Sequence, residues 1–129
     1  MMKPHALLLA MLALPACKMP QYVQAGTKND VAVDYRWNVP PDKPAELLLR
    51  LKNSGTSAQR IHIGLDLYYQ GFTVEELTAD TCIPAGRTFN GKLNGIYFIP
   101  KRITPEQASS PDTKVALTDF TAVPVGACP

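Results

Sequence analysis

The stretch Gln59-Arg-Ile-His-Ile-Gly-Leu-Asp-Leu-Tyr-Tyr69 decides the fold, because apolar and polar residues alternate along it with a period of two. In a β-strand that period places the two sets of side chains on opposite faces. The pattern therefore predicts a half-buried strand. Its inward face carries Ile61, Ile63, Leu65, Leu67 and Tyr69, and its outward face carries Arg60, His62, Asp66 and Tyr68.

Shorter segments on both sides repeat the alternation, and turn residues separate them. Asn94-Gly95 predicts a two-residue type I′ hairpin between strands at 88–93 and 96–99. The other expected strands are 31–39, 46–52, 72–77 and 115–123. About seven short antiparallel strands in one small domain predict an all-β fold, an immunoglobulin-like β-sandwich.

Two segments also have helical features. Residues 42–55 combine an Asp cap, an early Pro and a closing Gly, which is typical of a helix. We favour a strand at 46–52, because the long strand needs a partner and sequential strands tend to pair. Within the long loop 101–113, Thr104-Pro105-Glu106-Gln107 predicts a single helical turn near 104–109.

The first residues have the layout of a secretory signal. Lys3 supplies a positive charge, Ala6–Leu14 is an uninterrupted apolar run, and the small residue Ala16 precedes Cys17. Such a run is too short to cross a bilayer, which needs roughly 20 residues. Residues 1–16 are therefore expected to be a cleaved signal peptide.

The motif Leu14-Pro15-Ala16-Cys17 resembles the bacterial lipobox, although Pro15 is less usual at the second position. The resemblance implies that Cys17 becomes the first mature residue and carries a diacylglyceryl thioether, usually with a third acyl chain, which anchors a protein stably. Lys18 in place of Asp favours the outer membrane, facing the periplasm or the cell surface. We expect a polar lipidated tether over 17–29 and a folded domain over 30–129.

The chain has three cysteines, an odd number. If lipid occupies Cys17, as the lipobox implies, Cys82 and Cys128 remain. Export would place both in a compartment where disulfides persist. We therefore predict a Cys82–Cys128 disulfide, with two separate buried thiols as the alternative.

The stretch Leu47–Glu76 resembles bacterial Ig-like modules of the FxLyD and CARDB kind. The matching features are a strand that ends Leu51-Lys52-Asn53 before a Ser-Gly turn, and a long strand that ends Leu67-Tyr68-Tyr69. Pro84-Ala85-Gly86 followed by Phe89 fits the next element. The resemblance implies a binding or spacer domain of an exported protein, with no shared catalytic residues to transfer.

No set of residues indicates catalysis, a metal site or a cofactor. His62 is the single histidine of the mature chain, with Asp66 four residues further on, and we interpret it as a solvated surface residue. Glu75 and Glu76 would point to opposite faces of a strand. Without Lys3 the chain has twelve Lys and Arg against eleven Asp and Glu, scattered along its length, so nucleic acid is not an expected partner.

Aromatic residues are the candidate binding residues. Tyr68 and Tyr97 are expected to face outward and Phe72 to follow a turn, so a patch of exposed tyrosines could bind a protein or a sugar. Ordinary cross-strand packing on a wet face is the alternative.

Three functions follow in order of preference. The first is a non-enzymatic lipoprotein, held at the membrane by its lipid anchor, that serves as a binding or structural subunit of a cell-envelope protein complex. The second is a small ligand-binding or hydrolase-inhibitor module that uses the tyrosines and the 101–113 loop. A concave aromatic pocket would favour this second function. The third is an enzyme, which three converging titratable groups would favour.

Overall fold

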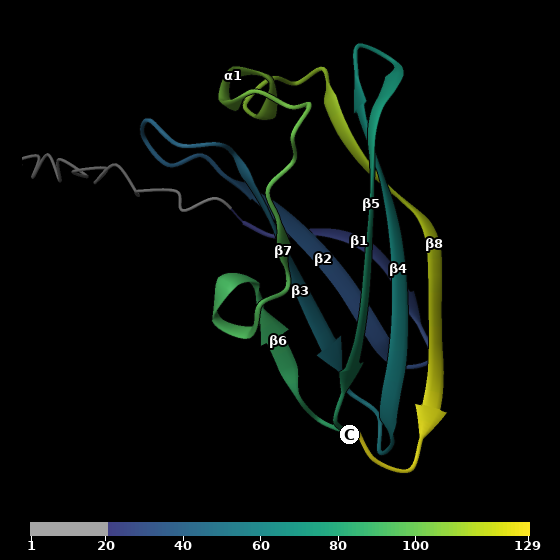
Figure 1. The fold of residues 1–129 in the computed structure, drawn as a ribbon. Coiled ribbons are helices and arrows are strands. Elements are labelled where there is room, and N and C mark those ends of the chain that lie inside the picture. The colour runs from purple at the N-terminus through teal and green to yellow at the C-terminus, as the bar shows by residue number, and fades with distance from the viewer. Residues whose placement is uncertain (1–20) are drawn as a thin grey trace, which may run out of the picture.

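The computed structural model describes residues 21–129, which form two antiparallel sheets packed face to face (Figure 1). Sheet A contains β1 (Val23–Lys28), β2 (Val31–Asn38) and β3 (Glu46–Asn53) in that order. The short strands β6 (Thr88–Asn90) and β7 (Tyr97–Phe98) both pair with the free side of β3. Sheet B contains β5 (Phe72–Ile83), β4 (Ala58–Tyr69) and β8 (Thr113–Val125), with β4 in the middle. The predicted all-β sandwich is confirmed.

The core lies between the sheets and follows the two-fold alternation. On β4 the side chains of Ile61, Ile63 and Leu67 are fully buried, whereas Arg60 is exposed. On β3 the alternate residues Leu47, Leu49 and Leu51 meet them from the other sheet. Burying one such side chain contributes about 1.5–3 kcal/mol. Residues 46–53 thus form the strand that we favoured over a helix.

The expected tether over 17–29 is wrong in its second half, because Val23–Lys28 forms β1 and pairs with β2. β1 is an edge strand with a bulge between Gln24 and Gly26, and most of its residues are exposed. An edge strand of this kind buries little, so its sequence shows no apolar period. Gly26 lies so close to Leu117 of sheet B that a Cβ would stand 2.8 Å from Leu117 Cδ2.

The hairpin expected at Asn94-Gly95 does not form. A 3-10 turn, Gly91–Asn94, separates β6 from β7, and both strands lie along β3 instead of pairing with each other. Two local hydrogen bonds hold the turn. The Asn94 side-chain oxygen accepts a hydrogen bond from the backbone N–H of Asn90, and the Ile96 N–H donates to the carbonyl of Gly91. Gly95 ends it with a positive φ of 68°, a conformation that glycine adopts without strain.

The predicted helical turn is confirmed as α1 (Pro105–Ala108). Thr104 and Gln107 form a reciprocal capping box: the Gln107 N–H donates to Thr104 Oγ1 at 3.1 Å, and the Thr104 N–H donates to Gln107 Oε1 at 2.9 Å. Strands β5 and β8 are longer than the expected 72–77 and 115–123.

Asn53 joins two connections between the sheets at one end of the sandwich. Its backbone N–H donates to Arg87, and its side-chain amide donates to the carbonyls of Ser57, Ile83 and Pro84 at 2.9, 3.2 and 3.3 Å. The side chain is fully buried; its bond to the Ile83 carbonyl is buried as well, and its bonds to Ser57 and Pro84 are partly buried.

The predicted disulfide is present between Cys82 and Cys128, whose Cα atoms are 5.6 Å apart. It ties the end of β5 to the chain beyond β8, at the end of the sandwich where Asn53 of sheet A bonds to Ile83. In the chain-entropy model, closing a loop of 46 residues contributes at most about 4 kcal/mol.

Replacing Asn53 by Asp should lower the free energy of unfolding by about 3 kcal/mol, because the carboxylate keeps the shape but removes the donor to the buried Ile83 carbonyl and to the partly buried carbonyls of Ser57 and Pro84. Urea denaturation followed by circular dichroism measures the change. The exposed Asn90→Ala variant is the control and should change stability by less than about 0.5 kcal/mol. Equal losses in the two variants would contradict the role assigned to Asn53.

Candidate functional site

The three aromatic candidates do not form one patch. Tyr68 lies on β4 of sheet B, and its hydroxyl donates to Asp66 at 3.3 Å. Phe72 begins β5 beside Tyr69 and is 76% exposed. Tyr97 pairs with Leu48 on sheet A, so the expected patch of Tyr68 and Tyr97 is wrong, because the two residues belong to different sheets. Cys17, the expected lipidation site, lies outside the described residues.

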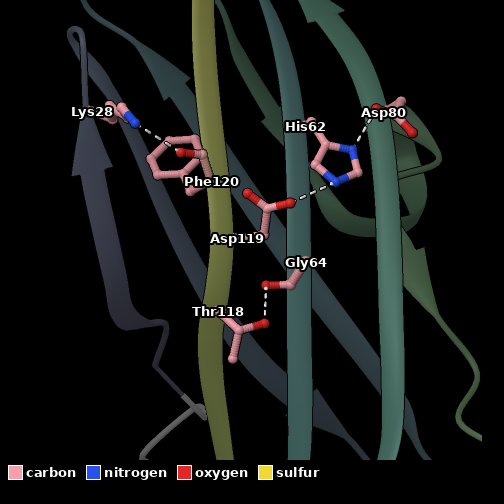
Figure 2. A network of polar contacts seen from close by, with 7 residues as sticks. All are labelled: Lys28, His62, Gly64, Asp80, Thr118, Asp119 and Phe120. Atoms are coloured by element: carbon pink, nitrogen blue, oxygen red, sulfur yellow. Dashed lines mark hydrogen bonds and ion pairs between the residues drawn. The ribbon is translucent and has the colours of Figure 1, made fainter.

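His62 is bound to two aspartates on the outer face of sheet B (Figure 2). Its Nδ1 lies 2.7 Å from Asp80 Oδ1 on β5, and its Nε2 lies 3.1 Å from Asp119 Oδ2 on β8. Asp66, the carboxylate four residues after His62 in the sequence, is not one of these two partners. These partners come from the adjacent strands, so the imidazole connects all three strands of sheet B.

Gly64 makes this arrangement possible. Asp119 lies opposite Gly64, and a Cβ on Gly64 would stand 2.9 Å from the Asp119 Cβ. The register shifts just after Gly64, where Thr118 donates its hydroxyl to the Gly64 carbonyl (Figure 2). A bulge of this kind re-aims side chains, and here Asp119 leans over the glycine toward the histidine.

The hydrogen bond to Asp80 raises the pKa of His62 above its ordinary value, and the charges of Asp80 and Asp119 raise it further, against partial desolvation. Three titratable groups do converge here, which is the condition set for an enzyme. However, each ring nitrogen faces a carboxylate, so the imidazole has no free nitrogen to act as a general base or a metal ligand. The group acts as an ionic clamp between strands.

A second polar group lies on the outer side of sheet A, and we call it the Tyr22 face. It consists of Tyr22, Arg36, Asn38, Glu46, Leu48, Arg50, Asn90, Lys92, Leu93 and Tyr97. The Tyr22 ring contacts two guanidinium groups, with Arg36 Cζ at 5.2 Å and Arg50 Cζ at 4.5 Å from its centroid. A cavity of about 330 Å³ lies beside the ring, between β2, β3 and the 3-10 turn.

Two of the three cations on the Tyr22 face have carboxylate partners. Arg50 binds Asp34 at 2.7 Å, and Lys92 binds the buried Glu46 at 2.5 Å. The hydrogen bond from Lys92 lowers the pKa of Glu46, and the same bond raises the pKa of Lys92. Arg36 makes no ion pair with any residue of 21–129, and its Nε is buried without a hydrogen-bond partner.

The largest cavity among residues 21–129, about 880 Å³, lies between the β2–β3 loop and the segment that leads into α1. Prolines, two isoleucines and charged residues line it: Pro40, Asp42, Lys43, Pro44, Ile99, Pro100, Lys101, Ile103, Thr104, Pro105 and Glu106. It therefore contains part of the 101–113 loop, but none of its lining residues is aromatic.

The four edges of the two sheets differ in how they are protected. β1 has a bulge, and the 3-10 turn separates β6 from β7. On β8, the carbonyls of Phe120 and Ala122 accept hydrogen bonds from the side chains of Lys28 and Asn29. β5 pairs only with β4 within the described chain, and from Glu75 to Ile83 its register is regular.

Within residues 21–129, no three His, Cys, Asp or Glu side chains are grouped to hold a metal ion. No helix in this part of the chain has the length and apolar character of a membrane span. Comparisons with protein-family models, curated proteins and solved structures found no match to this chain.

The His62 clamp should make stability depend on pH in a defined direction. Because the pKa of His62 is raised in the folded state, the stabilisation is fully present below the unfolded pKa of about 6.5 and is lost as pH rises through the folded value. The stability difference between the parent chain and His62→Gln should therefore be larger at about pH 5.5 than at about pH 8.5. Urea titrations at both pH values measure it.

The control for this effect is a chain that keeps the histidine but lacks its partners. Asp80→Asn with Asp119→Asn should remove most of the pH dependence that His62→Gln reveals. A pH-independent difference between the parent chain and His62→Gln would show that the ionic clamp does not stabilise the sheet.

Proposed function

We propose that this chain is a lipid-anchored, non-enzymatic protein of the bacterial cell envelope, and that its Ig-like domain binds a partner protein through the β5 edge. The observation that carries the proposal is the regular, one-sided pairing of β5 from Glu75 to Ile83. An unpaired strand edge presents backbone donors and acceptors to which an extended segment of a partner can add as a further strand.

The chemistry of β5 indicates what kind of segment it would accept. Glu76 is exposed along the strand, and Asp80 is exposed although it also binds His62. The carboxylate of Glu75 accepts hydrogen bonds from the backbone N–H groups of Lys101 and Arg102. Carboxylates repel a second copy of the same acidic edge, which opposes self-association. They attract an extended basic segment, so the preferred partner is an envelope protein with such a segment.

The position of β1 supports anchoring close to the membrane. β1 begins at Val23, so six residues, Cys17 to Tyr22, precede the sandwich in a chain that starts at Cys17. Fully extended, six residues span about 20 Å. The folded domain would therefore stay at the membrane surface, and the Cys82–Cys128 disulfide suits an exported protein.

A second candidate function uses the largest cavity. The 880 Å³ site is large enough for a small organic ligand, and its lining offers the cations Lys43 and Lys101 beside the carboxylates of Asp42 and Glu106. A small ligand or a loop of a hydrolase would be its occupant. Substituting Lys43 and Lys101 by Gln should then weaken ligand binding in calorimetry without affecting capture of a partner at β5.

Anchoring predicts a specific mass. Expressed with its full N-terminus in a Gram-negative host, the protein should lose residues 1–16, and its first peptide should carry a diacylglyceryl group on Cys17. Mass spectrometry of the membrane fraction measures this, and Cys17→Ser should shift the protein out of that fraction. A chain that keeps Met1 and an unmodified Cys17 would overturn the lipoprotein proposal.

Docking at β5 predicts a strand-specific crosslink. A photo-reactive amino acid at Thr78 on β5 should capture one envelope protein in intact cells, whereas the same amino acid at Thr121 on β8 should not. Both residues are exposed on sheet B, so they differ mainly in the strand edge that they report. Glu76→Lys should reduce the Thr78 yield, because it repels a basic segment. Equal capture from the two positions would refute docking at β5.

A further inference from the structure

We propose that the Tyr22 face lies against the membrane and binds the phosphate of an anionic phospholipid headgroup, while Leu93 enters the lipid interface. This inference depends on the proposed anchoring at Cys17. It adds an orientation for the domain and a second, non-covalent membrane contact.

The first argument is where the chain enters the domain. Tyr22 directly precedes β1 and lines the same cavity as Gly91 and Leu93. In Figure 1, β1 begins on the left, the side on which the turn between β6 and β7 projects. Five residue steps separate Cys17 from Tyr22, which is about 18 Å when fully extended. An anchored domain therefore holds this face close to the headgroups.

The second argument is the apolar side chain at the tip of the turn. Leu93 is 86% exposed, and Tyr97 is 37% exposed on the adjoining β7. The Lys92 ammonium lies 5.8 Å from the Tyr97 ring centroid, and Leu93 is the next residue along the chain. Leucine at an exposed tip, with tyrosine and lysine beside it, is the combination that suits the boundary between acyl chains and headgroups.

The third argument is the unused charge of Arg36. Carboxylates neutralise Arg50 and Lys92, but Arg36 has no ion-pair partner among residues 21–129. Its guanidinium packs on Tyr22 beside the 330 Å³ cavity, whose other polar lining includes the amide of Asn90 and the amide of Asn38, which also donates to Glu46 at 2.8 Å. A guanidinium with nearby amide donors matches the geometry of a phosphate.

The test uses the complete lipidated protein in vesicles. A mature chain with lipid on Cys17 and a Cys82–Cys128 disulfide has no free thiol, so Leu93→Cys gives one labelling position for an environment-sensitive fluorophore. Thr121→Cys, on the outer face of sheet B, is the matched control. Vesicles of phosphatidylglycerol and of phosphatidylcholine, each containing a lipid-borne quencher, distinguish headgroup charge from mere proximity.

The label on Leu93→Cys should be quenched by the lipid-borne quencher, more strongly in phosphatidylglycerol, and should be shielded from aqueous iodide. The label on Thr121→Cys should behave in the opposite way. Adding Arg36→Gln should lower the ratio of docked to undocked protein in phosphatidylglycerol by about fivefold, because one cation near an anionic surface contributes about that factor. High salt should reduce the same ratio.

Mass spectrometry of the same samples separates the two proposals. If Cys17 carries its acyl chains and the two labels are equally exposed to iodide, the membrane orientation is wrong while the anchoring stands. If Arg36→Gln leaves the preference for phosphatidylglycerol unchanged, the phosphate site is wrong. A protein without acyl chains would overturn both proposals.

Discussion

The buried amide of Asn53 is the constraint on which the arrangement of the sheets depends. The chain leaves sheet A after β3 to enter β4, and it leaves sheet B after β5 to return to β6. Asn53 bonds to Ser57 in the first connection, to Ile83 and Pro84 in the second, and through its backbone to Arg87. A buried carbonyl such as that of Ile83 requires a donor, and the one buried amide of Asn53 supplies it where both connections meet.

The two sheets that Asn53 connects have outer faces of different chemistry. Sheet B is held together across its strands by His62 and its aspartates, and by the disulfide near the end of β5. These links leave the far edge of β5 unpaired within residues 21–129. Sheet A carries the arginines stacked on Tyr22 and the exposed turn at Leu93, close to where the chain enters. In the proposed function, the two sheets serve a partner and a membrane at the same time.

The sequence predicted the strands in which one face is buried, because burial leaves a regular alternation of apolar residues. It missed the features that depend on contacts with other strands. The alternation of 59–69 identified β4 because one face of that strand is buried along its length. β1 was missed because an edge strand with Gly26 at a bulge needs few apolar residues. The prediction of a hairpin at Asn94-Gly95 was wrong. An Asn-Gly turn forms a hairpin only when the flanking strands pair with each other, and here β6 and β7 both pair with β3 instead. The partners of His62 depend on cross-strand register, which no local spacing encodes.

The early start of β1 changes how strongly the domain has to bind. Six residues in place of a thirteen-residue tether confine an anchored domain to a thin layer above the bilayer. For a partner in the same membrane, association is then governed by an effective concentration, which reaches the millimolar range for short links. A contact that would be too weak to detect between freely diffusing molecules could therefore be occupied most of the time. Such a contact would also remain quickly reversible, which suits an accessory subunit that has to exchange.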